Sequence, residues 1–122
     1  MNNIKDRSYK FALLAIKFIS KLPNKRLYWV IGDQLLRSAT SIGANIIEAK
    51  GASSKKDFIN FYSHSLKSAN ETIYWLSLLK DAQTLKTDYF EILIKEAKEL
   101  AKMIAASIIT MKNSSKLKTL NY

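Results

Sequence analysis

A periodic run of apolar residues near the end of the chain most constrains how this sequence can fold. Between residues 90 and 111, apolar side chains recur in alternating steps of four and three. They are Phe90, Ile94, Ala97, Ala101, Ile104, Ile108 and Met111. This spacing puts them on one face of an α-helix and is typical of the seam between antiparallel packed helices. The pattern predicts a long helix that packs lengthwise against other helices.

The rest of the chain divides into three further helical segments. We predict helices over residues 4–21, 26–50, 54–82 and 87–112, followed by a frayed basic tail at 113–122. Pro23 ends the first helix, and Gly51 follows the second. Ser54 and Asp57 resemble a capping box at the start of the third helix, and Thr87 can cap the fourth.

Composition supports an all-α fold. The chain has 122 residues, of which 3 are Gly, 1 is Pro and 48% are hydrophobic, so turns are few. No segment has the alternation of a strand, and the length suits one domain. Long helices joined by short connections predict a single up-down-up-down antiparallel four-helix bundle.

Several classes of protein are disfavoured by what the sequence lacks. There is no Cys, so thiolate metal sites and disulfides are excluded, and a cytoplasmic location is expected. Lys17 interrupts the first apolar run, which argues against a signal peptide, and we expect no membrane contact. The Glu-x-x-His pairing of di-iron bundles does not occur, so we predict no metal site and no cofactor.

The second predicted helix carries an ordered polar stripe. Gln34, Arg37, Ser41, Asn45 and Glu48 fall within a sector about 80° wide at 100° per residue. Gly32 and Gly43 each weaken this helix by roughly 0.5–1 kcal/mol relative to Ala. We expect the helix to be continuous all the same, held by close packing of its small residues.

The third predicted helix carries a matching stripe. A hairpin that turns near residues 52–53 would place Gln34 opposite Glu71 and Ser41 opposite His64, with Arg37 close to Glu71. A charge-assisted pair between Arg37 and Glu71 would then join the two helices. We predict a structural polar network or subunit contact, not a reaction centre, formed by Gln34, Arg37, Ser41, Asn45, Glu48, His64, Ser68 and Glu71.

The same residues carry a resemblance to a known bacterial family. The motif comprises Gln34, Leu35, Arg37, Ser41, Ile42, Asn45, Ile46, Glu48, Asp57, Phe58, Phe61, Ser68 and Glu71. In this spacing the chain resembles the proteins encoded within intervening sequences of 23S ribosomal RNA genes. The resemblance implies a four-helix bundle that assembles into a homo-oligomer, typically a pentamer, with no established enzymatic activity. A similar fold serves as the accessory protein of diversity-generating retroelements, which works with a reverse transcriptase.

Charge suggests a polyanionic partner. The net charge is +10, and residues 1–56 hold 11 basic and 3 acidic residues, a net of +8. Such a bias promotes contact with RNA or DNA phosphates. We assign such contacts to Arg7, Lys10, Lys17, Lys21, Lys25, Arg26, Lys50, Lys55 and Lys56. The alternative is an ordinary solvated surface.

Two other functional classes stay open at this stage. One is a structural or protein-interaction module, such as a reverse-transcriptase accessory protein, that does not bind nucleic acid independently. The other is an enzyme built on Ser41, His64 and Glu48. The chain has no Gly-rich nucleophile turn or visible oxyanion arrangement, so we predict no catalytic residues.

Overall fold

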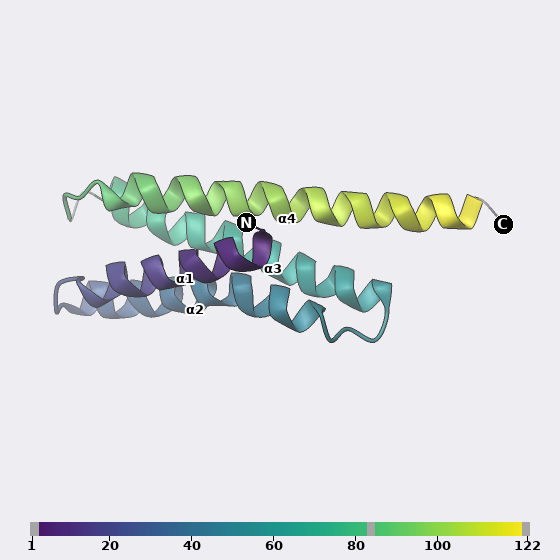
Figure 1. Cartoon of the computed structure of the whole chain (residues 1–122). Helices are drawn as coiled ribbons and strands as arrows, with labels where there is room; N and C mark the ends of the chain where they lie inside the picture. Colours follow the sequence, from purple (N-terminus) through teal and green to yellow (C-terminus); the bar gives the residue numbers. More distant parts are fainter. Residues whose placement is uncertain (1–2, 83–84, 121–122) are drawn as a thin grey trace.

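The chain folds into four antiparallel α-helices. The computed structural model describes residues 3–82 and 85–120, of which 115–120 are described by their backbone alone. The helices are α1 (Ile4–Ser20), α2 (Arg26–Ala49), α3 (Lys55–Asp81) and α4 (Tyr89–Leu120). Each helix packs against the next, and α1 also packs against α4, which closes the bundle (Figure 1). The predicted all-α four-helix bundle is confirmed.

Polar side chains cap α1, α3 and α4, and the sequence predicted the caps of α3 and α4. The Ser54 hydroxyl accepts a hydrogen bond from the Asp57 backbone N–H (3.1 Å), which opens α3. The Thr87 hydroxyl accepts from the Tyr89 N–H (3.2 Å), so α4 begins two residues after the predicted start. Asn3 caps α1 in the same way, through Asp6. These caps satisfy backbone donors that have no partner inside the helix.

The end of α4 differs from the prediction. We expected the helix to stop near Lys112, but its backbone remains helical to Leu120. Residues 113–120 contain neither Gly nor Pro, and their Lys and Leu residues are good helix formers, so nothing in this stretch ends the helix. The loss of apolar periodicity after Lys112 therefore does not mark the end of the helix. Residues 121 and 122 of the predicted tail lie outside the described residues.

Most residues of the predicted seam of α4 are buried in the core, and two further leucines of this helix are buried with them. Phe90, Ile94, Ala97, Ile104 and Ile108 are buried, whereas Ala101 and Met111 are half-buried. Leu93 and Leu100, which the seam left out, are buried as well. The buried stripe is wider because α4 packs against both α1 and α3. Phe18 of α1 meets Phe90 edge to face, with ring centroids 5.3 Å apart.

Small residues bring α1 and α2 close together. A Cβ atom added at Gly43 would lie 3.1 Å from the hydroxyl oxygen of Ser8, a buried residue of α1. One added at Gly32 would meet Ile19 at 3.6 Å, an ordinary contact distance. The helix α2 is unbroken from Arg26 to Ala49, as the sequence predicted. Close packing along α1 therefore holds a helix whose own propensity is low.

Candidate nucleic-acid interface

The polar stripe of α2 reaches α3 through Arg37. Its Nη2 donates to Gln34 Oε1 (2.7 Å) on its own helix and to Glu71 Oε1 (2.9 Å) on α3. The predicted pair between Arg37 and Glu71 therefore forms. The side chain of Arg37 is 59% exposed and that of Glu71 is 35% exposed, so water screens the pair and its contribution to stability is small.

Two other stripe residues bond within α2 instead of crossing to α3. The Ser41 hydroxyl donates to the Arg37 carbonyl oxygen (2.6 Å), and the Asn45 amide donates to the Ser41 carbonyl oxygen (2.8 Å). The side chain of Glu48 is exposed, and its carboxylate accepts no hydrogen bond from the described residues. The network between helices is thus narrower than predicted, because a short side chain on a helix reaches its own preceding turn first.

The stripe borders a polar groove between α2 and α3. The groove has a volume of about 590 Å³, and Arg37, Ser41, Asn45, His64, Lys67, Ser68 and Glu71 line it. Glu48 is not among these residues, so the groove does not bring together Ser41, His64 and Glu48. Among the described residues there is also no cluster of His, Asp and Glu side chains that could hold a metal ion.

Buried hydroxyl groups form the more enclosed contact between α2 and α3. The Thr72 hydroxyl shares its one proton between the Ser38 hydroxyl oxygen on α2 (2.9 Å) and the Ser68 carbonyl oxygen on its own helix (2.8 Å). The Ser65 hydroxyl donates to the Ile42 carbonyl oxygen (2.8 Å). Ser38, Ser65 and Thr72 are 0% exposed. We did not predict these contacts. The spacing of Ser65, Ala69 and Thr72 on one helical face was the signal that could have revealed them.

Arg7 is placed differently from the prediction. Its guanidinium binds both carboxylate oxygens of Glu96 on α4, with Nη2–Oε1 at 2.6 Å and Nε–Oε2 at 3.1 Å. This hydrogen bonding raises the pKa of Arg7 above its ordinary value. Both side chains are about three-quarters covered. Arg7 therefore joins α1 to α4, and its charge is already matched by Glu96 within the bundle.

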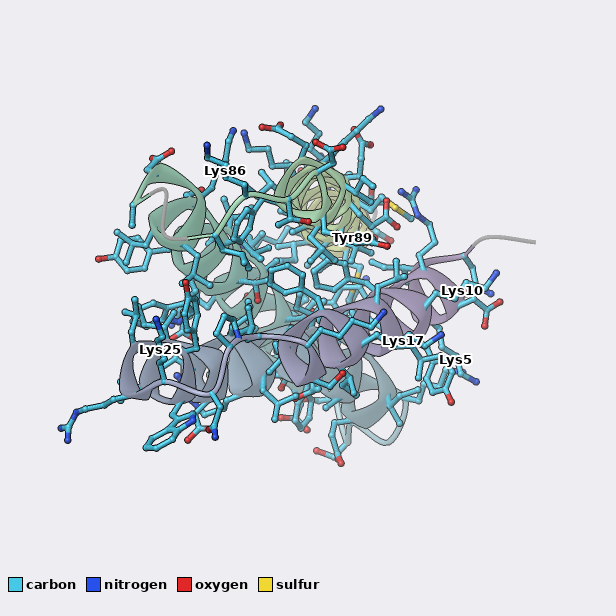
Figure 2. All side chains as sticks on the ribbon, turned by 90° about the vertical axis from the view of Figure 1, so that its left-hand side faces the viewer. Lys5, Lys10, Lys17, Lys25, Lys86 and Tyr89 are labelled. Carbon is cyan, nitrogen blue, oxygen red and sulfur yellow. The ribbon has the colours of Figure 1, made fainter. Side chains whose placement is uncertain are left out.

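The remaining predicted basic residues are exposed. They are Lys10, Lys17, Lys21, Lys25, Arg26, Lys50, Lys55 and Lys56. Apart from Lys10, which has an interaction within the chain, none forms an ion pair with a carboxylate of the described residues. Figure 2 shows Lys25 on the connection between α1 and α2, at the end of the bundle nearest the viewer, and Lys10 and Lys17 on α1.

A second group of cations gathers where α1 begins and α2 ends. Lys5 lies beside Lys50, and the contact between these two like-charged groups lowers the pKa of Lys50 below its ordinary value. Lys55 and Lys56 follow on the first turn of α3. Lys5 was not among the predicted residues. Its proximity to Lys50 depends on the packing of α1 against α2, which the sequence pattern does not specify.

Comparison with known proteins identifies the family. A profile of the 23S rRNA-intervening sequence proteins matches residues 2–106. The chain belongs to this family. The match includes the polar stripe and all the predicted basic residues, whereas the last turns of α4 lie beyond it.

A solved structure from a related protein has a fold similar to that of this chain. The chain is similar to a protein of unknown function from the S23 ribosomal protein family of Bacteroides thetaiotaomicron. The two are 40% identical with a TM-score of 0.81, over 87% of this chain and 98% of that one. Among proteins of curated function, none matches the sequence significantly. No helix in the part of the chain described here is both long and apolar enough to cross a bilayer.

Proposed function

We propose that this family member is a non-enzymatic cytoplasmic protein that binds RNA or DNA through phosphate contacts, with little sequence selectivity. The observation that carries the proposal is a set of exposed cations without carboxylate partners in the described part of the chain. They are Lys17, Lys21, Lys25, Arg26, Lys50, Lys55 and Lys56. Cations that are not neutralised within the protein remain available to release counterions from a nucleic acid.

The pair formed by Lys5 and Lys50 supports a polyanion in particular. Two ammonium groups held together repel each other, and this repulsion lowers the pKa of Lys50. A phosphate between them would reverse the effect by favouring the charged form of both groups. The two lysines are therefore a place where a phosphate would relieve the repulsion between like charges.

We also propose that the protein acts as a homo-oligomer, with the pentamer of the resembling family as the expected state. Exposed apolar side chains on α1 and α2, which we call the apolar face, support assembly; they are Tyr9, Leu13 and Ile16 of α1 and Trp29, Leu36 and Ile47 of α2. The spacing of each set of three places it on one side of its helix, and exposed apolar surface is typical of protein contacts. Repetition of a weak basic surface around a ring would strengthen binding to one polyanion through avidity.

A salt titration tests the nucleic-acid proposal. Fluorescence anisotropy with labelled single-stranded RNA and duplex DNA should show affinity that falls steeply as salt rises. The variant Lys50→Gln/Lys55→Gln/Lys56→Gln should bind more weakly, and the slope of log affinity against log salt should shrink by about 0.7–0.9 per lost contact. These lysines are exposed, so the variant should keep its melting temperature.

The matched control is Lys98→Gln, which removes an exposed lysine from α4. It should leave both affinity and slope close to those of the wild type. No binding at low salt, or binding that does not respond to salt, would contradict the proposal. That result would favour the alternative, which is a structural or protein-interaction module such as a reverse-transcriptase accessory protein. The apolar face of α1 and α2 supports this alternative.

A further inference from the structure

An apolar cleft lies at one end of the bundle, between the second half of α1 and the start of α4. Its volume is about 430 Å³, and its lining includes the aliphatic side chains of Leu14, Leu22, Leu85 and Ile92. Leu14 is 46% exposed and Ile92 is 53% exposed, so the cleft opens to solvent. Sites of this size with mostly apolar walls and a few polar groups are typical of small-molecule binding.

Two of the four polar side chains that line the cleft are cationic, and the other two are Thr87 and Tyr89. Lys17 and Lys21 both belong to its lining, and they stand one turn apart on the same side of α1. Neither is paired with a carboxylate of the described residues. Figure 2 views this end of the bundle and shows Lys17 on α1 and Tyr89 at the start of α4. The cleft therefore combines aliphatic walls with two hydrogen-bond donors that carry positive charge.

From this combination we propose that the cleft binds a free medium-chain carboxylate. Its carboxylate contacts Lys17 and Lys21, and its hydrocarbon tail lies along Leu14, Leu85 and Ile92. The ammonium groups match the charge of the ligand, and the walls match its tail. This ligand is separate from the nucleic acid proposed above, although the two would compete for the same pair of lysines.

The walls favour a hydrocarbon tail over an unpaired nucleobase. The edge of a base carries donors and acceptors that lose free energy when they are buried without partners. The lining contains no side-chain amide or carboxylate to accept from the N–H groups of a base, and its two ammonium groups only donate. The Thr87 hydroxyl already accepts from the Tyr89 backbone N–H, which leaves the Tyr89 hydroxyl as a side-chain acceptor. A hydrocarbon tail has no such groups, so it leaves no polar atom unsatisfied in the cleft.

Titration calorimetry of the full chain with hexanoate, octanoate and decanoate, below their micelle concentrations, tests the proposal. Each added methylene that enters the cleft should strengthen binding about fourfold. The neutral analogue 1-octanol should bind more weakly than octanoate, because it has no charge for the lysines.

Variants separate the two halves of the site. The change Lys17→Gln/Lys21→Gln should reduce octanoate binding at least tenfold, as expected for the loss of charge-assisted contacts, and leave octanol binding unchanged. Ile92→Gln should flatten the dependence on chain length. Lys98→Gln and Ile109→Gln are matched controls, because both residues are exposed on α4 outside the cleft, and neither should alter binding.

Other outcomes would overturn the inference. One is an affinity that does not depend on the chain length of the carboxylate. Another is a loss of octanoate binding in the Ile109→Gln control that equals the loss in the cleft variants. Binding of adenosine monophosphate or a short oligonucleotide that Ile92→Gln abolishes, without carboxylate binding, would make the cleft a base site instead. Binding to anionic phospholipid vesicles but not to free acids would make it a membrane contact. The salt titration with Lys50, Lys55 and Lys56 tests nucleic-acid binding separately.

Discussion

At the scale of single residues, the polar side chains divide by burial into two kinds of contact between α2 and α3. The conspicuous residues, Arg37 and Glu71, form a screened pair at the surface. The inconspicuous residues, Ser38, Ser65 and Thr72, are fully buried and bond across the helices. A buried hydroxyl group needs a hydrogen-bond partner within the protein, because water cannot reach it to supply one. These hydroxyl groups therefore specify the alignment of the two helices more strictly than an exposed ion pair does.

This distinction predicts how Thr72→Val should behave. Valine has a similar shape but can donate neither to Ser38 nor to the Ser68 carbonyl oxygen, so the free energy of unfolding should fall by about 1 kcal/mol. The Ser38 hydroxyl keeps its own bond to the Leu35 carbonyl oxygen, which limits the loss. Urea denaturation measures the change.

The control is Thr110→Val, at an exposed position on α4, which should alter stability by less than about 0.5 kcal/mol. If the two variants proved equally stable, the buried Thr72 hydroxyl would contribute nothing, and the alignment of α2 with α3 would need another explanation.

At the scale of the helices, α2 depends on its neighbours more than on its own sequence. It carries two glycines, and a run of small residues from Ser38 to Ser41 adds little helix propensity. Its buried residues nevertheless face α1 and α3 along its whole length. The two glycines differ in their surroundings, since Gly43 lies against Ser8 and Gly32 has ordinary contact distances around it.

Alanine substitutions should therefore have different effects at these two positions. Gly32→Ala should raise the free energy of unfolding by about 0.5–1 kcal/mol, because alanine favours the helix and its Cβ fits. At Gly43 the new Cβ would lie 3.1 Å from the Ser8 hydroxyl oxygen, so Gly43→Ala should gain less or be destabilising. Thermal melts of both variants give the comparison.

The double variant Ser8→Ala/Gly43→Ala removes the atom that crowds the new methyl group. It should recover stability relative to Gly43→Ala alone. Equal stabilisation by Gly32→Ala and Gly43→Ala would mean that α1 and α2 are not as close at Ser8 as the structure places them.

At the scale of the whole molecule, closing the bundle leaves three surfaces exposed in the described part of the chain, besides the apolar cleft between α1 and α4. One is the apolar face of α1 and α2, another is the polar groove between α2 and α3, and the third is formed by cations on α1 and at the two ends of α2. Arg7 shows that closure also withdraws a cation from the surface, since Glu96 of α4 binds it. Two of these surfaces, the apolar face and the polar groove, are available for a second copy of the chain.

Light scattering of the purified protein tests which surface assembles. The wild type should have a mass close to five times the 13.9 kDa of one chain. Leu13→Asp, at a position 41% exposed in the single chain, should dissociate the oligomer if the apolar face is the contact, because a carboxylate would be buried without a partner.

The paired variant Arg37→Ala/Glu71→Ala makes the same test for the polar groove, which we also predicted as a possible subunit contact. Dissociation by this variant but not by Leu13→Asp would assign assembly to the groove. A wild-type mass equal to that of one chain would contradict assembly altogether.

The sequence by itself determined the four helices, their antiparallel order, the caps at Ser54 and Thr87, and the approach of Arg37 to Glu71. These features follow from periodicity and short connections, which act along one helix or across one hairpin. Only the tertiary structure decided that Arg7 is neutralised by Glu96, that Lys5 lies against Lys50, and that Ser65 and Thr72 bond across to α2. Those contacts join residues that are distant in the chain, and they depend on the rotation of each helix about its own axis. Close packing of small residues fixes that rotation only when the bundle closes.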